Sequence, residues 1–167
     1  MILVGGGSRG GKTAYALERA RRFGPRLAYV ATAEALDEEM CARATAHRNE
    51  RGQQFTTIEE PLALPALIEQ RAVGFDAMVI DCLTVWLSNV MLSEAHDTEE
   101  ATRRLVEAAS GNGSTLIFVT NEVGAGIVPD NELARRFRDQ AGWLNQQMAA
   151  AADEVYLMAF GCPLKVK

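Results

Sequence analysis

The chain has 167 residues, of which 48% are hydrophobic and 23% charged, and its formal net charge at pH 7 is −5. These values fit one ordinary globular domain spanning residues 1–167. Lys and Arg are spread thinly, without the basic patch of a duplex-binding protein, so no nucleic-acid partner is expected.

The three cysteines, Cys41, Cys82 and Cys162, form no CxxC pair, which argues against a disulfide framework and against a zinc site. No run of 18 apolar residues is present, so no membrane span is expected. The chain begins with the strand-like MILVGG, with no charged segment before an apolar one, and a cytoplasmic location is the default expectation.

Short apolar runs alternate along the chain with longer helical patterns. Strands are expected at 2–5, 27–31, 77–81, 115–121 and 155–160, with weaker candidates at 54–59 and 164–167. Helices are expected at 12–23, 36–50, 62–71, 82–92, 97–109 and 131–151. Uninterrupted apolar strands are typical of a parallel sheet covered on both faces, so the pattern predicts a three-layer α/β fold.

Helix 131–151 has the clearest periodicity. Its apolar stripe, at spacings of three and four, consists of Leu133, Phe137, Ala141, Leu144 and Met148. In helix 82–92, Trp86 lies at a helical spacing typical of core packing.

The segment GGGSRGGKT, residues 5–13, contains the Walker A pattern directly after an expected strand and at the start of an expected helix. Glycines allow successive backbone N–H groups to surround an anion, and the helix N-terminus adds a favourable dipole. A glycine-rich turn that matches by accident is the alternative. The predicted nucleotide-binding residues here are Gly6, Gly7, Ser8, Arg9, Gly10, Gly11, Lys12 and Thr13. The fold class is therefore expected to be a P-loop NTPase, RecA-like, with a mostly parallel sheet flanked by helices.

A P-loop also needs a carboxylate for Mg²⁺, usually at the end of an apolar strand. Asp81 ends the strand AMVID and is the best candidate, with Thr13 as the second metal ligand. The alternative is that Asp81 caps the helix that follows. At another strand end, Asn121 and Glu122 of TNEVG are candidates either for substrate contact or for a turn.

The segment CARATAHRNERG, residues 41–52, contains His47, one of two histidines in the chain. By periodicity alone, a histidine near a helix end is more often solvated or a partner of the helix dipole. Arg48 and Arg51 nevertheless offer guanidinium groups that suit phosphate oxygens. His96 lies in the polar stretch SEAHDTEE and is expected to be solvated.

Taken together, GGGSRGGKT, YVATAEALDEEMCARATAHR, IDCLTVWLSN and the segment from TNEVG to DEVY resemble the bifunctional adenosylcobinamide kinase / adenosylcobinamide-phosphate guanylyltransferase family of cobalamin biosynthesis. The resemblance covers nearly the whole chain. Departures from the family pattern are Gly10 in place of serine, Ala46 where relatives can carry a second histidine, and a short segment around 93–100.

The resemblance implies two reactions. ATP or GTP phosphorylates adenosylcobinamide, and GMP from GTP then passes through a covalent intermediate on His47 to the adenosylcobinamide phosphate. It further implies nucleotide contacts at Thr32, Ala33, Glu34, Arg48, Asn49, Glu50, Arg51, Glu59 and Asp81, and a homotrimer. The alternatives are a P-loop small-molecule kinase without nucleotidyl transfer and a non-catalytic nucleotide-binding module.

Overall fold

The computed structural model describes residues 1–33, 52–111 and 113–167 of the chain. The strands in these ranges are β1 (Ile2–Gly6), β2 (Leu27–Ala31), β3 (Phe55–Glu59), β4 (Ala77–Asp81), β5 (Thr115–Val119), β6 (Glu154–Ala159) and β7 (Cys162–Lys165). The helices are α1 (Lys12–Ala20), α3 (Leu64–Arg71), α4 (Leu83–Leu92), α5 (Thr98–Ser110) and α6 (Glu132–Ala151), with 3₁₀ turns η1 (Gly52–Gln54) and η2 (Ala72–Gly74).

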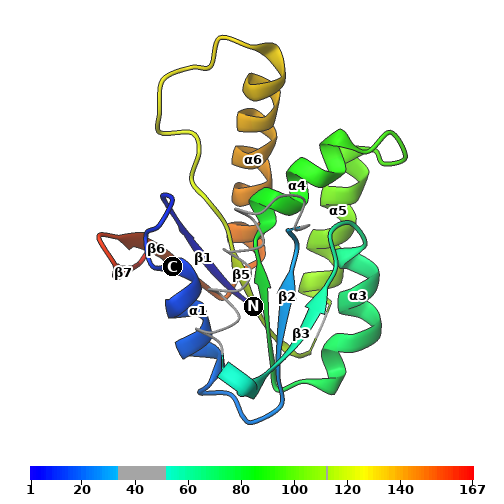
Figure 1. Cartoon of the computed structure of the whole chain (residues 1–167), viewed down its shortest axis with the longest axis vertical. Helices are drawn as coiled ribbons and strands as arrows, with labels where there is room; N and C mark the ends of the chain where they lie inside the picture. The colour runs from blue at the N-terminus through cyan, green and yellow to red at the C-terminus, as the bar shows by residue number, and fades with distance from the viewer. Residues whose placement is uncertain (34–51, 112) are drawn as a thin grey trace.

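The strands form one sheet in the order β3-β2-β4-β5-β1-β6-β7 (Figure 1). All neighbouring pairs are parallel except β6 and β7, which pair antiparallel at one edge. The predicted α/β fold with a mostly parallel sheet flanked by helices is confirmed, including both weaker strand candidates. The expected helix at 36–50 lies outside the described residues.

Helices cover both faces of the sheet (Figure 1). On one face, Ala16, Leu17 and Ala20 of α1 pack against the strands. On the other face, α3, α4, α5 and α6 contribute to a second and larger apolar cluster. Because side chains alternate along a strand, each central strand supplies both clusters: Met78 and Ile80 of β4 face the larger one, and Ala77 and Val79 face α1.

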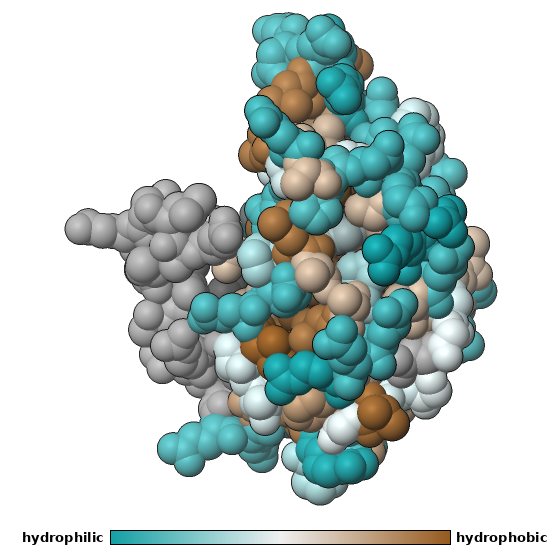
Figure 2. Space-filling model, turned by 90° about the vertical axis from the view of Figure 1, so that its right-hand side faces the viewer, coloured by the Kyte–Doolittle hydropathy of each residue, from teal (hydrophilic) through white to brown (hydrophobic). Residues whose placement is uncertain are grey.

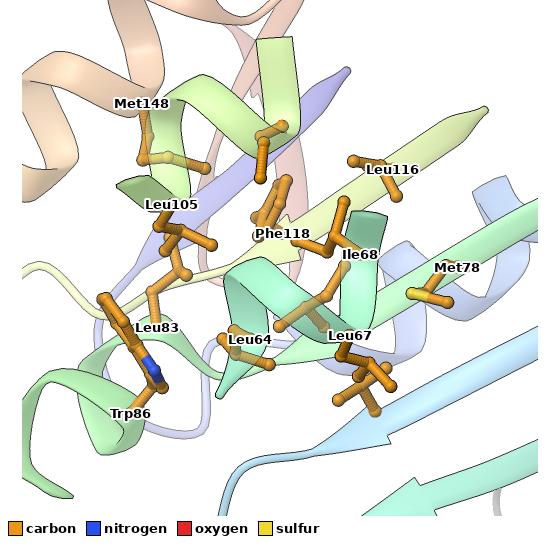
Figure 3. Packing of buried hydrophobic residues seen from close by; sticks show 14 of the residues in the cluster. Leu64, Leu67, Ile68, Met78, Leu83, Trp86, Leu105, Leu116, Phe118 and Met148 are labelled. Carbon is orange, nitrogen blue, oxygen red and sulfur yellow. The ribbon is translucent and has the colours of Figure 1, made fainter. Parts of the chain in front are cut away.

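Trp86 of α4 lies in the larger cluster, as predicted from its spacing. Figure 3 shows its ring beside Leu83, on the side of Leu64 from α3. The ring is 0% exposed, and its Nε1–H donates a hydrogen bond to the carbonyl oxygen of Leu62 at 2.8 Å. The polar atom of this large core residue is therefore satisfied.

Helix α6 buries only part of its apolar stripe. Ala141, Leu144 and Met148 are buried, whereas Leu133 is 52% exposed. A helix of 20 residues is ~30 Å long, about twice the length of a five-residue strand. Its first turns and the preceding loop therefore extend beyond the carboxyl edge of the sheet, where no strand lies beneath them (Figure 1).

Seen from the side of α3 and α5, the surface is mostly hydrophilic, with apolar residues gathered in a few patches (Figure 2). On α5, the exposed residue Arg103 forms ion pairs with Glu100 and Glu107 one turn to either side. Among the described residues, no helix has both the length and the apolar character needed to cross a membrane.

Candidate nucleotide-binding site

Two glycines at the ends of the loop between β1 and α1 have positive φ angles. Gly6 has φ 145° and Gly11 has φ 86°, values that side chains disfavour. A Cβ on Gly6 would lie 2.7 Å from the carbonyl oxygen of Met158, so β6 also requires glycine there. Gly11 is the N-cap residue of α1, and the loop therefore leads directly into the helix N-terminus, which favours bound anions.

Lys12, the first residue of α1, folds back over the loop. Its side chain is buried, with 7% exposure, and Nζ donates a hydrogen bond to the carbonyl oxygen of Gly7 at 2.6 Å. Burial lowers the pKa of the Lys12 ammonium, while the nearby Cys82 and Asp81 act in the opposite direction. The structure thus places one largely desolvated cation at the mouth of the phosphate-binding loop.

Thr13 and Asp81 are 68 residues apart in sequence but adjacent in space. The Thr13 hydroxyl donates to Oδ2 of Asp81 at 2.6 Å. Asp81 is the last residue of β4 and Thr13 is in the first turn of α1, so both lie at the carboxyl edge of the sheet. Open α/β sheets bind their ligands at this edge.

These two oxygen groups fit Mg²⁺ chemistry. A nucleotide-bound Mg²⁺ commonly takes one or two protein oxygens and completes its shell with phosphates and water. A hydroxyl and a carboxylate 2.6 Å apart form such a pair. No group of three or more His, Cys, Asp or Glu residues suited to a metal occurs in the described ranges, so an all-protein metal cage is not formed there.

Tyr29 is a residue that sequence reasoning missed at this site. It lies in β2 with 4% exposure, and its hydroxyl is 3.0 Å from Oδ2 of Asp81. The only signal in the sequence was its place in LAYVA, two residues before the residue that pairs with Asp81. The contact between Tyr29 and Asp81 can be inferred only once β2 and β4 are known to be neighbours.

Thr32 follows β2 and is completely buried. Its hydroxyl donates to the carbonyl oxygen of Cys82 and accepts from the Cys82 N–H, both at 2.8 Å. Its own N–H donates to the carbonyl oxygen of Asp81 at 3.1 Å, and its carbonyl oxygen accepts from Asn89 Nδ2 at 2.8 Å. Thr32 therefore joins the end of β2 to the junction of β4 and α4.

The remaining predicted contacts are distributed along the same edge or lie elsewhere in the chain. Ala33 is exposed just after β2, and Glu59 is exposed at the end of β3, two strand positions from Asp81. Outside the described residues lie Glu34, His47, Arg48, Asn49, Glu50 and Arg51. The structure thus brings Lys12, Thr13 and Asp81 together, and the role predicted for His47 stays a prediction.

The turn after β5 adjoins the phosphate-binding loop. The N–H of Glu122 donates to the carbonyl oxygen of Gly6 at 3.1 Å. The side chain of Glu122 accepts from the Gly124 N–H at 2.6 Å, and the N–H of Asn121 donates to the Thr84 hydroxyl at 2.7 Å. These bonds belong to a structured turn, while the exposed carboxylate of Glu122 remains accessible at the site edge.

A shallow cavity of about 570 Å³ lies elsewhere, near Phe23, Asp76 and Thr115. These residues lie at or before the amino ends of β4 and β5 or after α1, at the edge of the sheet opposite the phosphate-binding loop. This position, away from the phosphate-binding loop, argues against the cavity as the nucleotide site despite its volume.

Comparison with known proteins agrees with this geometry. Residues 2–166 match the family described as cobinamide kinase / cobinamide phosphate guanyltransferase. The bifunctional adenosylcobalamin biosynthesis protein CobP of Pseudomonas aeruginosa is 39% identical over 166 residues, which cover 99% of this chain and 96% of the relative. The bifunctional adenosylcobalamin biosynthesis protein CobU of Salmonella typhimurium is 40% identical, over 100% of this chain and 99% of the relative. The Escherichia coli protein of the same name is 37% identical over the same shares.

Proposed function

The chain belongs to the cobinamide kinase / cobinamide phosphate guanyltransferase family, as its resemblance predicted, and on that premise we propose that its single domain catalyses two successive transfers. In the first, the hydroxyl of the aminopropanol arm of adenosylcobinamide takes the γ-phosphoryl group of ATP or GTP. In the second, GMP passes from GTP through His47 to the new phosphate, giving adenosylcobinamide-GDP and pyrophosphate. The family match over residues 2–166 is the observation that carries this pair of activities.

The geometry of the P-loop supports the kinase reaction. Backbone N–H groups of the loop and the helix N-terminus favour the β- and γ-phosphates, and Lys12 replaces its bond to Gly7 with phosphate oxygens. Phosphoryl transfer depends mainly on positioning and charge stabilisation. A buried lysine with few competing partners suits that role, because a desolvated cation interacts strongly with an anion.

Thr13 and Asp81 are the residues that would hold Mg²⁺, Thr13 through its hydroxyl and Asp81 through its carboxylate. A bound cation would neutralise the negative charge that develops on the phosphate oxygens during transfer. The protein contributes the fixed separation of the two ligands, which belong to different elements of the fold.

In the proposed nucleotidyl transfer, a ring nitrogen of neutral His47 attacks the α-phosphorus of GTP, and pyrophosphate leaves. A phosphate oxygen of the phosphorylated substrate then attacks the same phosphorus, and the bond to His47 breaks. A neutral imidazole is abundant near pH 7, and covalent catalysis divides one difficult transfer into two easier ones. We assign phosphate contacts in this step to Arg48 and Arg51.

Labelling with [α-³²P]GTP tests the second reaction. We expect an acid-labile, base-stable label on the wild-type protein and none on His47→Ala. His96→Ala is the matched control, because His96 is exposed and its Nδ1 contacts only the Ser93 hydroxyl, at 2.9 Å, among the described residues. That variant should label normally.

The same preparation separates the alternatives. A small-molecule kinase without nucleotidyl transfer would phosphorylate adenosylcobinamide from [γ-³²P]ATP but take up no α-label. A non-catalytic nucleotide-binding module would do neither. Loss of label in both histidine variants would show that the effect is not specific to His47.

We also propose a homotrimer, which the resemblance implies, and a cytoplasmic location, which is the default expectation from the sequence. Light scattering of the purified chain would test the trimer directly, because a monomer has a mass of 18.2 kDa.

A further inference from the structure

We propose that Tyr29 is a positioning residue that orients the Asp81 carboxylate and thereby sets the affinity of the P-loop for Mg²⁺. This inference rests on the proposed function, which places the cation on Thr13 and Asp81. It adds a third residue to this site, from β2, a strand that carries neither the phosphate-binding loop nor Asp81.

The strand register places Tyr29 on the correct face. In the pairing of β2 with β4, Ala31 lies opposite Asp81 and Tyr29 opposite Val79. Alternation along the strand puts Tyr29 and Ala31 on the same face, and Tyr29 belongs to the cluster that packs under α1. The long side chain therefore spans the distance from the strand interior to its carboxyl edge.

Burial of Tyr29 strengthens the case that its hydroxyl is hydrogen-bonded to Asp81. The Tyr29 side chain is 4% exposed within an apolar cluster, and a buried phenol hydroxyl needs a partner. A carboxylate only accepts, so the hydroxyl donates to Oδ2 of Asp81. Hydrogen bonds to a charged group are stronger than those between neutral groups.

The same carboxylate oxygen accepts from two directions. Thr13 donates from α1 at 2.6 Å and Tyr29 donates from β2 at 3.0 Å. The χ2 torsion of Asp is broad, and a single donor restrains it less than two donors do. Two donors anchored on different elements restrict that rotation, and the orientation toward the metal position is set before the nucleotide arrives.

Tyr29→Phe is the discriminating variant, because it keeps the ring in the core and removes only the hydroxyl. The measurement is the affinity for GTP, followed by a fluorescent analogue, at increasing Mg²⁺ concentration and in excess EDTA. We expect the Mg²⁺ concentration at half-maximal effect to rise about 3- to 10-fold, the size of one ordinary net hydrogen bond, because Thr13 still donates to the Asp81 carboxylate. The affinity in EDTA should stay at the wild-type value.

Tyr156→Phe is the control. Tyr156 also donates its hydroxyl to a carboxylate, that of Glu154, but on β6 and away from Asp81. It should leave the Mg²⁺ midpoint unchanged. In an Asp81→Asn background, Tyr29→Phe should have no further effect on the midpoint, since the two residues act through one group.

An unchanged midpoint in Tyr29→Phe overturns the proposal, and so does an equal loss of affinity with and without Mg²⁺, which would indicate a general packing role. A different outcome is that GTP binding by the wild-type protein does not depend on Mg²⁺. That result would contradict the Mg²⁺ site of the proposed function, and the role of Tyr29 would fall with it.

Discussion

The ammonium group of Lys12 lies 2.6 Å from the carbonyl oxygen of Gly7, so the phosphate-binding loop closes on its own lysine. The contact spans five residues and holds a cation that is otherwise shielded from water. Nucleotide binding exchanges this neutral acceptor for charged phosphate oxygens. The exchange is favourable because hydrogen bonds between two charged groups are the stronger kind.

Replacing Lys12 with methionine keeps an unbranched side chain, one atom shorter, and removes the charge. We expect the affinity for GTP to fall roughly 10- to 100-fold, the equivalent of a lost charged hydrogen bond of about 1.5–3 kcal/mol. Isothermal titration calorimetry measures the change. Lys165→Met, at an exposed position on β7, is the control, and equal affinities for the two variants would contradict the assigned role.

Thr32→Val tests whether the Thr32 hydroxyl serves the fold or the nucleotide. Valine leaves the Cys82 N–H and carbonyl without their side-chain partner, and we expect a loss of about 1–3 kcal/mol in the free energy of unfolding. Urea denaturation measures it, and Thr32→Ser should lose less because it keeps the hydroxyl. Unchanged stability combined with weaker GTP binding would instead favour a direct nucleotide contact.

The two tryptophans provide a matched test of packing. Trp86→Phe removes the donor to Leu62 and leaves a void in the core, so we expect a loss of about 1–3 kcal/mol in the free energy of unfolding. Trp143 is 53% exposed, and Trp143→Phe should change the stability by no more than about 0.5 kcal/mol. Acrylamide should quench Trp143 fluorescence in the native protein and leave that of Trp86 largely unaffected.

Asp76 predicts a pH-dependent part of the stability. Its carboxylate accepts from the side chain and backbone N–H of Arg26, and these bonds lower its pKa below the ordinary 3.8. A folded-state pKa below the unfolded one gives stability that is present above 3.8 and lost as pH falls through the lowered value. Asp76→Asn should therefore be less stable than wild type at pH 7, and the gap should shrink below pH 3.8.

Chemical denaturation between pH 7 and acid pH measures the difference in unfolding free energy between Asp76→Asn and the wild type. Asp139→Asn, at an exposed position of α6, should show little difference from wild type at any pH. A gap for Asp76→Asn that persists unchanged in acid would mean that shape, and not charge, accounts for the effect.

Cys82 and Cys162 should differ in reactivity. Burial, followed by the negative charge of Asp81, raises the pKa of the Cys82 thiol to about 11. At pH 8 only ~1 in 1,000 of such thiols is ionised, and the thiolate is the reactive form. Iodoacetamide followed by peptide mass spectrometry should therefore find Cys162, which is exposed, alkylated well before Cys82. Comparable rates in the native protein would contradict the burial of Cys82.

Local patterns in the sequence sufficed for the strands, the described helices and the Walker loop. Apolar runs and helical periodicity indicate which faces of the elements are buried. The glycine spacing indicates a backbone conformation that other residues disfavour. The position of Asp81 could also be predicted from the sequence, because a carboxylate that ends an apolar strand lies at the ligand-binding edge of a parallel sheet. The whole-chain resemblance supplied the family, which the comparison confirmed.

Only the tertiary structure decided which side chains share a hydrogen bond across the sheet. The order β3-β2-β4-β5-β1 brings Tyr29 and Thr32 beside Asp81 and Cys82, more than 45 residues away in sequence. Strand order depends on how all the elements pack together, and no local pattern records it. The sequence by itself thus determined the elements, the phosphate-binding loop and its carboxylate, whereas the partners that orient that carboxylate follow from long-range packing.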